Sequence, residues 1–368
     1  MTESDQPEKI LVALSGGVDS SVAAALLCEQ GIPVEAAYMK NWINEDEIFG
    51  NCPWEEDIED AQAVADTLGI PFRIVNLITE YKERIVDYLV AGYTNGITPN
   101  PDVMCNREIK FGAFRDVATD LGFAAVATGH YAQNRLADDG LWELFEGADP
   151  NKDQSYFLAL MQQEQIAAAR FPIGHLPKPQ VREEAKRFGL PTATKKDSQG
   201  ICFIGKIQMA DFLAAYVPDN PGPIVDPSGK RVGEHRGLPF FTFGQRRGIG
   251  VASAVEGMHY VVVDKRAETN ELVIALEGPE TPRLWARACT VCHISTTGRP
   301  LDAARNMLVR PRYRAPAYPA HFEPLGDGRA RVTFSEPQRA LTPGQIAAFH
   351  DGPVVLGGAV FEEIDYDA

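Results

Sequence analysis

The chain has 368 residues, of which 45% are hydrophobic and 23% charged, and its formal net charge is −16. One hydrophobic core seldom serves so many residues, so we expect two or three domains of a soluble globular protein. No apolar run approaches the ~20 residues of a membrane span, and the acidic N-terminal segment lacks the apolar core of a signal peptide. These features favour a cytoplasmic protein whose six cysteines are mostly free thiols.

Short apolar segments alternate with helical patterns in the first half of the chain. In chain order we expect these strands and helices: 9–15 (strand), 19–31 (helix), 34–40 (strand), 54–69 (helix), 71–77 (strand), 80–96 (helix), 106–122 (helix) and 124–130 (strand). Repeated strand–helix units predict an α/β fold with a doubly wound parallel sheet. Ligands of such sheets bind beyond the carboxyl ends of the strands, so residues 15–21, 38–40 and 128–130 should line the site.

The sequence SGGVDSS, residues 15–21, links the first expected strand to the first expected helix. Two glycines allow a tight turn with open backbone N–H groups, the serines add hydroxyl donors, and the helix directs its positive end at an anion. The loop has neither the Gly-Lys-Ser/Thr of a Walker motif nor the G-x-G-x-x-G of dinucleotide folds. It resembles the pyrophosphate loop (PP-loop) of ATP pyrophosphatases, which cut ATP between the α and β phosphates. The alternative is an ordinary strand–turn–helix capped by Asp19 or Ser20.

The second half of the chain differs from the first in its pattern of expected helices and strands. Residues 155–215 have largely helical patterns, a Pro/Gly-rich linker begins near residue 217, and short strands follow. We therefore expect a PP-loop catalytic domain over residues 1–216, a small β-rich central domain over 217–280 and a C-terminal β-barrel over 281–368.

Arginine is concentrated near the C-terminus. Residues 281–350 contain ten Arg, no Lys and four acidic residues, a local charge of +6 in an acidic chain. Local patches rather than totals bind phosphates, so this segment could contact nucleic acid. An Arg-rich solvated strand surface is the simpler alternative, and charge alone does not choose between them.

Two cysteines lie in segments that favour a thiolate. In TPNPDVMCN, residues 98–106, two prolines fix an irregular loop before Asp102 and Cys105, and Asn106 is a candidate cap for the next helix. In KKDSQGICFIGK, residues 195–206, Cys202 follows two lysines. A helix N-terminus or basic neighbours lower a thiol pKa. The alternative is a buried cysteine with a capping carboxylate, since the sequence alone does not bring the two thiols together.

Ten motifs in order make nearly the whole chain similar to the bacterial tRNA-specific 2-thiouridylases. They are SGGVDSS, YMKNW, NPDVMCN, TGHYA, NKDQSYFL, FPIGHLPKPQVR, DSQGICFIG, GQRRGIG, PRYR and LTPGQ. The departures are small, because Gln199 and Met104 stand where the family often has Thr and Leu, and neither supplies chemistry.

The resemblance implies a reaction that replaces the 2-oxygen of the wobble uridine (position 34) of tRNA by sulfur. ATP would adenylate that oxygen and release pyrophosphate, and AMP would leave with the oxygen. Sulfur would arrive as a persulfide on Cys202, with Cys105 as nucleophile and Asp102 as general acid/base or as the group that positions it. Sulfur could pass directly or as sulfide, and either route forms a 105–202 disulfide that must be reduced.

The resemblance also assigns binding residues and partners. The nucleotide site comprises Ala13, Leu14, Ser15, Gly16, Gly17, Val18, Asp19, Ser20, Met39 and Gly129. The tRNA-contacting residues are Asn100, Pro101, Asp102, His130, Lys152, Asp153, Gln154, Arg312, Tyr313 and Gln345. Mg²⁺ would accompany ATP, although no dedicated metal site is visible in the sequence. The expected partners are tRNAs for Lys, Glu and Gln and a persulfide donor, either a cysteine desulfurase or a relay protein.

Two rival functions and one decoy remain from the sequence. One rival is a PP-loop synthetase that adenylates a small molecule, which leaves Cys105 and Cys202 unexplained. The other is a redox-sensing nucleotide-binding module that binds ATP without releasing pyrophosphate. The decoy is CTVCH, residues 289–293, which matches a haem-attachment pattern. Its flanks predict a strand, in which positions 289 and 292 face opposite sides, so we expect no haem or zinc there.

Overall fold

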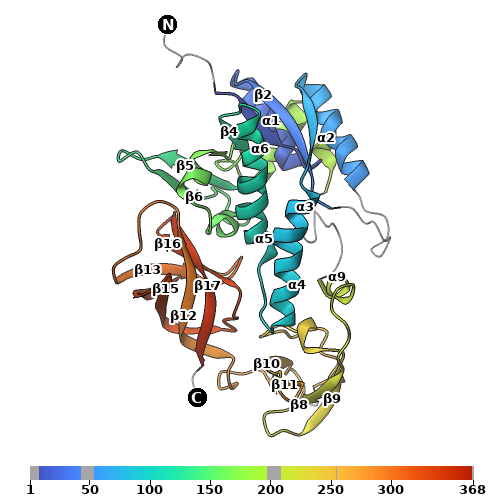
Figure 1. Ribbon diagram of the computed structural model, residues 1–368, viewed down its shortest axis with the longest axis vertical. Coiled ribbons are helices and arrows are strands. Elements are labelled where there is room, and N and C mark those ends of the chain that lie inside the picture. The colour runs from blue at the N-terminus through green and yellow to red at the C-terminus, as the bar shows by residue number, and fades with distance from the viewer. Residues whose placement is uncertain (1–7, 43–53, 197–208, 254, 367–368) are drawn as a thin grey trace.

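The computed structural model describes residues 8–42, 54–196, 209–253 and 255–366. Figure 1 shows an α/β region at the top, a β-barrel at the lower left and a small β region at the bottom. Cys52 and Cys202, with the rest of the segments 43–53 and 197–208, lie outside the described residues.

A five-stranded parallel sheet organises the N-terminal region. Its strands in spatial order are β3 (Phe72–Asn76), β2 (Val34–Lys40), β1 (Ile10–Ala13), β4 (Ala125–Ala127) and β7 (Ala169–Arg170). Alternate residues of β1 point to opposite faces, because Ile10 and Val12 belong to one buried cluster and Leu11 and Ala13 to another.

Helices cover both faces of this sheet. One face packs against α1 (Val18–Glu29), α2 (Trp54–Leu68) and α8 (Lys178–Arg187). The other packs against α3 (Ile78–Tyr81), α4 (Asp87–Thr94), α5 (Pro101–Met104), α6 (Phe114–Asp120) and two π-helical segments, η1 (Lys82–Val86) and η2 (Cys105–Ala113). The doubly wound parallel sheet expected from the sequence is confirmed.

The helix expected over 106–122 begins earlier than the sequence suggested. Pro101 occupies its first turn, and the Asn100 Oδ1 atom accepts a hydrogen bond from the Val103 backbone N–H at 3.2 Å. The expectation that Asn106 caps this helix is therefore wrong. A proline tolerates the first turn because its missing N–H would have no helical partner there, and the asparagine before it supplies the cap. Cys105 consequently lies inside a continuous helical run rather than at its start.

The segment after the sheet is only partly helical. It contains η3 (Ser155–Leu158), α7 (Gln163–Ala167), η4 (Pro191–Thr194) and α9 (Met209–Ala214), as well as α8 and the short strand β7. The small β region follows as a four-stranded sheet. Its order is β10 (Tyr260–Arg266), β11 (Glu271–Leu276), β8 (Gly222–Val225) and β9 (Arg231–His235), with the short helix η5 (Leu238–Phe240) beside it.

Six antiparallel strands close into the C-terminal barrel. Their order is β12 (Trp285–Thr296), β15 (Arg329–Arg339), β14 (Tyr318–Gly326), β13 (Arg305–Arg310), β16 (Ile346–Asp351) and β17 (Val354–Tyr366), and β17 pairs back to β12. Phe322, Phe334, Phe349 and Phe361 fill its interior and are almost fully buried. The expected β-rich central region and C-terminal barrel are thus present.

A hairpin from the N-terminal half extends the barrel sheet, which the sequence did not predict. β5 (Ala132–Leu136) pairs with β6 (Trp142–Glu146), and β6 pairs with β17 through Leu144–Val355 and Phe145–Val354. The N-terminal half and the barrel therefore share one continuous sheet. None of the helices in the described ranges is long and apolar enough to cross a membrane.

Candidate nucleotide and sulfur-transfer site

The loop after β1 turns sharply and leaves the start of α1 open. Gly16 has φ +70°, and a Cβ there would lie 2.6 Å from the Asp57 backbone oxygen, so only glycine fits. Gly17 is the N-cap of α1, and no side chain caps that helix. The alternative that Asp19 or Ser20 merely caps the helix is therefore wrong. The uncapped N–H groups and the helix dipole make this end of α1 suited to an anion.

The serine hydroxyls of the loop are used largely within the loop. Ser20 Oγ and Ser21 Oγ donate to the Gly17 carbonyl oxygen at 3.1 and 2.8 Å, and Ser20 Oγ accepts from the Ser15 backbone N–H at 3.2 Å. These bonds hold the turn in shape. The backbone N–H groups, more than the hydroxyls, are what the loop offers to a phosphate.

Asp19 is the centre of a small polar cluster beside the loop. Its carboxylate accepts hydrogen bonds from Tyr131 Oη at 2.8 Å and from Lys178 Nζ at 2.8 and 2.9 Å. Lys178 opens α8, which the sheet packing brings next to α1. The cluster places one ammonium group at the mouth of the loop and fixes it there.

Four of the residues predicted to bind nucleotide are core residues. The exposed fractions of Ala13, Leu14, Val18 and Met39 are 6%, 1%, 3% and 4%. Their side chains belong to the two clusters that pack the sheet, so only their backbone atoms are placed to meet a ligand.

The segment after β4 joins the phosphate loop to the helical run that carries Cys105. A Cβ at Gly129 would lie 2.6 Å from the backbone of Asp19 and Ser20, so this segment touches the loop directly. The adjacent His130 is buried, and its Nε2 atom lies 3.5 Å from the Lys110 ammonium of η2. The segment of residues 128–131 therefore contacts both the glycine loop and the helical segment η2, and we call this segment the shared wall of the predicted site.

His130 is held as a neutral imidazole. Burial, and then the nearby positive charge of Lys110, lower its pKa well below the usual value. The Lys110 ammonium donates to Nε2, which leaves Nδ1 as the protonated nitrogen, and its partner is Thr128 Oγ1 at 2.7 Å. The His130 ring also packs edge-on against Phe171. These contacts of His130 hold the segment of residues 128–131 against η2.

Cys105 begins the π-helical segment η2 and is completely buried. A π-helix leaves backbone carbonyls without their usual partners, and here Gln165 Nε2 donates to the Arg107 and Phe111 carbonyl oxygens at 2.8 and 2.9 Å. Such segments are frequent at functional sites. Asp102 lies one turn before Cys105, and its backbone carbonyl accepts from Asn106 Nδ2 at 3.0 Å.

The loop before Cys105 is fastened to the barrel. Gln345 Nε2 donates to the Thr98 and Pro99 carbonyl oxygens at 2.9 and 3.2 Å, and Asn100 Nδ2 donates to Gln345 Oε1 at 3.4 Å. The Thr98 backbone N–H bonds to the Pro343 carbonyl at 3.0 Å. The structure thus brings together Asn100 and Gln345, which are 245 positions apart.

The predicted tRNA-contacting residues 153 and 154 have internal partners. Asp153 is buried, pairs with Arg310 at 2.7 Å and accepts hydrogen bonds from the Ser155 and Gly147 backbone N–H groups. Gln154 Oε1 accepts from the Tyr131 backbone N–H at 3.0 Å. These two side chains shape the turn, and the neighbouring Lys152 is half-buried.

Arg312 and Tyr313 follow β13 at the surface of the barrel. Arg312 is exposed, whereas Tyr313 is half-buried, with its ring centroid 4.3 Å from that of Phe157. Tyr156, next to Phe157, donates from its hydroxyl to the Ile346 carbonyl at 3.0 Å. The aromatic contacts connect the Arg312 surface to the loop that Asn100 and Gln345 hold.

Comparisons with known proteins agree along the chain. A curated protein named tRNA-specific 2-thiouridylase MnmA, from Akkermansia muciniphila, is 56% identical over 97% of this chain and 99% of its own. The chain belongs to the tRNA-specific 2-thiouridylase family. The MnmA of Shigella flexneri is 47% identical over 98% of both chains.

Family models divide this 2-thiouridylase family member into three parts. Those described as tRNA methyl transferase HUP domain, tRNA methyl transferase PRC-barrel domain and Aminomethyltransferase beta-barrel domain match residues 8–206, 210–276 and 286–361. A solved 4-thiouridine synthetase–RNA complex with bound ATP is 22% identical and covers 54% of this chain and 46% of its own, with a TM-score of 0.34. So low a score supports no statement about function.

Cys28, Cys289 and Cys292 of this 2-thiouridylase family member are free thiols. Burial raises the pKa of Cys28, Cys289 and Cys292, for Cys289 to about 12, which makes them poor nucleophiles. Cys289 and Cys292 lie on β12, as the sequence predicted, and Cys289 packs into the barrel. No described pair forms a disulfide, and Cys202 lies outside the described ranges, so the expected 105–202 pair stays a prediction.

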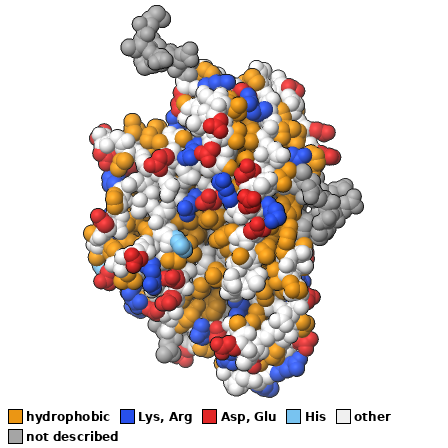
Figure 2. All heavy atoms as spheres, viewed as in Figure 1, with side chains coloured by type: hydrophobic (Ala, Val, Ile, Leu, Met, Phe, Trp, Pro, Cys, Tyr) orange, Lys and Arg blue, Asp and Glu red, His pale blue; other side chains and the backbone are white. Residues whose placement is uncertain are grey.

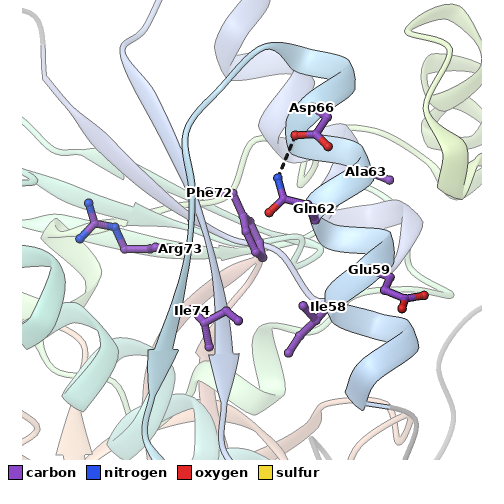
Figure 3. Close-up of a pocket in the computed structure, with 8 residues that line it drawn as sticks. All are labelled: Ile58, Glu59, Gln62, Ala63, Asp66, Phe72, Arg73 and Ile74. Carbon is purple, nitrogen blue, oxygen red and sulfur yellow. Dashed lines mark hydrogen bonds between the residues drawn. The ribbon is translucent and has the colours of Figure 1, made fainter.

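No group of three or more His, Cys, Asp or Glu side chains among the described residues could hold a metal ion. A separate hollow lies between α2 and β3, and Figure 3 shows Phe72 and Ile74 of β3 facing Ile58 of α2. Gln62 of α2 donates a hydrogen bond to Asp66 at 2.8 Å. No predicted site residue lines this hollow.

Sequence reasoning missed Lys178, Tyr131, Lys110 and Gln165. Tyr131 and Lys178 stand inside the motifs TGHYA and FPIGHLPKPQVR, which marked the segments but not the side chains that matter. Lys110 and Gln165 carry no signal in the sequence, because only the packing of η2 against its neighbours gives them a partner.

Proposed function

We propose that this protein is an ATP-dependent tRNA 2-thiouridylase that acts on the wobble uridine. The observation that carries the proposal is the 56% identity to a curated 2-thiouridylase over 97% of this chain and 99% of that protein. The geometry supports it, since residues 128–131 contact both the loop at the open start of α1 and, through Lys110, the segment η2 that begins at Cys105.

The open end of α1 would receive the phosphates of ATP. Backbone N–H groups after Gly17 would contact phosphate oxygens, and Lys178, held by Asp19, would add positive charge at the loop. Mg²⁺ would enter bound to the phosphates, because Asp19 is already paired with Lys178 and the described residues form no metal cage. The uridine O2 would attack the α-phosphorus, and pyrophosphate would leave.

Sulfur transfer would follow at the adenylated carbon. A persulfide on Cys202, delivered by a cysteine desulfurase or a relay protein, would supply the sulfur atom. Its terminal sulfur would bond to C2 and AMP would leave with the former oxygen. Cys105 would attack the inner sulfur, so that a 105–202 disulfide forms and a reductant regenerates both thiols. Asp102, three positions before Cys105, would move or position a proton.

The tRNA would lie over the loop of residues 97–102 and the barrel. Asn100, Pro101 and Asp102 would meet the target base, and Gln345 would hold their loop against the barrel. Arg312 would contact phosphate, and Tyr313 would stack on a base. The tRNAs would be those for Lys, Glu and Gln, and the protein would work in the cytoplasm, where thiols stay reduced.

The matching family models carry methyltransferase descriptions, so methyl transfer is the second candidate. It is less well supported, because methyl transfer requires neither an ATP pyrophosphate loop nor a reactive thiol pair. The two activities leave different products, which nucleoside analysis separates.

The test is mass spectrometry of tRNA nucleosides after incubation with ATP, a persulfide donor and a tRNA transcript that carries uridine at position 34. We expect 2-thiouridine, with pyrophosphate released only when tRNA is present. Cys105→Ser and Cys202→Ser should each abolish the product, whereas Cys28→Ser and Cys292→Ser should retain it. Pyrophosphate release without tRNA would favour a small-molecule synthetase, and a methylated nucleoside would favour the second candidate.

A further inference from the structure

Four arginines from two regions meet in a shallow depression where the small β region contacts the barrel. Its lining residues are Gly244, Gln245, Arg246, Arg247, Arg312 and Arg339. The first four come from the motif GQRRGIG, which the proposed mechanism does not use, and Arg312 comes from PRYR. Segments about 65 positions apart in sequence thus form one basic surface.

The turn that carries Arg246 and Arg247 is rigidly built. Gly244 and Gly248 have φ of +75° and +72°, which bends the backbone on either side of the two arginines. Gln245 spans the turn, because its Oε1 accepts from the Thr242 N–H at 2.9 Å and its Nε2 donates to the Arg247 carbonyl at 2.8 Å. The backbone of Gly244 and Gln245 also bonds to Val262 of β10. The arginines therefore project from a fixed base.

The barrel docks directly on this turn. Arg339 Nη2 donates to the Gly244 carbonyl at 3.1 Å, and a Cβ at Gly244 would collide with the Ala340 side chain. Glu277 pairs with Arg246 and, at 2.8 Å, with Arg339, and these arginines lower its pKa to about 2. One carboxylate thus serves two arginines, and among the described residues no carboxylate pairs with Arg247 or Arg312.

Four guanidinium groups therefore line the depression, and together with the Glu277 carboxylate that pairs with two of them they give a local charge of +3. Like charges are gathered at a cost that an anion would offset, and guanidinium groups match the geometry of phosphate oxygens. On the face seen in Figure 2, Lys and Arg are interspersed with Asp and Glu rather than spread as one basic field. A nucleic acid would then be held by compact clusters of this kind.

We propose that Arg246, Arg247, Arg312 and Arg339 form one binding site for backbone phosphates of the tRNA, so that the small β region belongs to the tRNA-binding surface. The inference rests on the proposed function. It assigns a role to residues 244–247, which line the same depression as Arg312. Tyr313 and Phe157 continue from Arg312 towards the loop of Asn100, so a strand gripped here would lead to the target site.

The experiment measures the affinity of the full-length protein for a tRNA transcript with uridine at position 34 over a series of salt concentrations. Each phosphate contact contributes roughly 0.7–0.9 to the slope of log K against log salt. Arg247→Ala should flatten the slope by about one contact and lower the affinity on the order of tenfold. The double variant Arg247→Ala/Arg312→Ala should flatten it by about two contacts.

Two variants make the comparison sharp. Arg247→Lys keeps the positive charge but loses the planar guanidinium group, which can donate two parallel hydrogen bonds to one phosphate. The salt dependence of tRNA binding should therefore match that of the wild type, while the affinity for tRNA falls. Arg231→Ala is the matched control, because Arg231 is an exposed arginine on β9 of the same region, paired with Glu234 and outside the depression. It should change neither quantity, and ATP affinity should be the same in all the variants.

Two results would overturn the inference. One is a wild-type slope and affinity in Arg247→Ala from an enzyme that still releases pyrophosphate only with tRNA; the proposed function then stands without this site. The other is that Arg247→Ala loses binding of inorganic pyrophosphate but not of tRNA, which would assign the cluster to a free anion. Absence of tRNA binding by the wild-type protein would instead contradict the proposed function itself.

Discussion

Asp19 holds two side chains in place at the phosphate loop, Lys178 through an ion pair and Tyr131 through its hydroxyl. Asp19→Ala would release both and leave the ammonium group free to move. We expect pyrophosphate release in the presence of tRNA to fall about 100-fold, since small displacements at a reaction centre carry costs of that order. The assay is pyrophosphate release at saturating ATP, with the melting temperature measured alongside.

Tyr131→Phe is the matched control for Asp19→Ala. It removes one hydrogen bond to the carboxylate and leaves the Lys178–Asp19 pair intact, so its loss of activity should be much smaller. A folded Asp19→Ala protein with wild-type activity would remove this cluster from the mechanism.

The contact between the β16 side of the barrel and the loop before Cys105 is the critical one at the scale of elements. Gly344 has φ +90°, and a Cβ there would clash with Ile97 and lie 2.9 Å from the Thr98 carbonyl oxygen. Gly344→Ala should therefore displace the loop that carries Asn100. We expect a loss of about 1–3 kcal/mol in the free energy of unfolding from backbone strain, and a larger fall in thiolation rate than that loss explains.

Gly352→Ala is the matched control, because it introduces the same kind of backbone strain as Gly344→Ala without a clash against the loop before Cys105. Gly352 also has positive φ, +56°, in the turn between β16 and β17, but a Cβ there meets nothing within 4 Å. This variant should lose similar stability and keep its activity. Equal losses of activity in the two variants would mean that the fixed position of the loop does not matter.

Patterns within one element allowed the sequence to predict much of this architecture. The apolar periodicity placed β1, α1, β2 and α2 within a few residues of their observed bounds, because each buries a regular face. The hairpin β5–β6 was missed, since its strands are half-exposed and their partner β17 is more than 200 positions away. Local patterns carry no information about such a partner.

In the candidate site, too, local features could be predicted from the sequence and contacts between distant residues could not. The glycine loop and the segment of Cys105 could be proposed from the sequence because their chemistry is local in sequence. The start of the helix at Pro101 was misplaced, because Asn106 and Asn100 are equally good caps by type and only the proline at the first turn decides between them. Lys178 reaches Asp19 across 159 positions, which no local pattern predicts.

His350 makes the stability of the whole molecule depend on pH. It is fully buried between the barrel and the hairpin, its Nδ1 atom lies 3.4 Å from Glu146, and burial and then Arg310 lower its pKa to about 4. The folded state holds it neutral while the unfolded chain protonates it near pH 6.5, so stability should fall as the pH drops from 6.5 towards 4. The loss between pH 7 and pH 5 should be about 2 kcal/mol.

Urea unfolding at both pH values measures this loss. The pKa of Glu146 is raised by burial, which works in the opposite direction, so the histidine is isolated by comparison with His350→Leu. That variant should lose most of the difference between pH 7 and pH 5, whereas His321→Leu, an exposed control on β14, should keep it. An unchanged pH dependence in His350→Leu would show that another group is responsible.

The shared sheet also sets an order for synthesis on the ribosome. Strand β6, made before residue 147, finds its partner only when Pro353, Val354 and Val355 emerge. Until then the nascent catalytic half carries a bare strand edge, and edges of that kind invite pairing with other chains. Expression of residues 1–216 alone would leave that edge open permanently. A nascent chain that has not yet made Pro343 and Gln345 also lacks the hydrogen bonds that fasten the loop before Cys105 to the barrel.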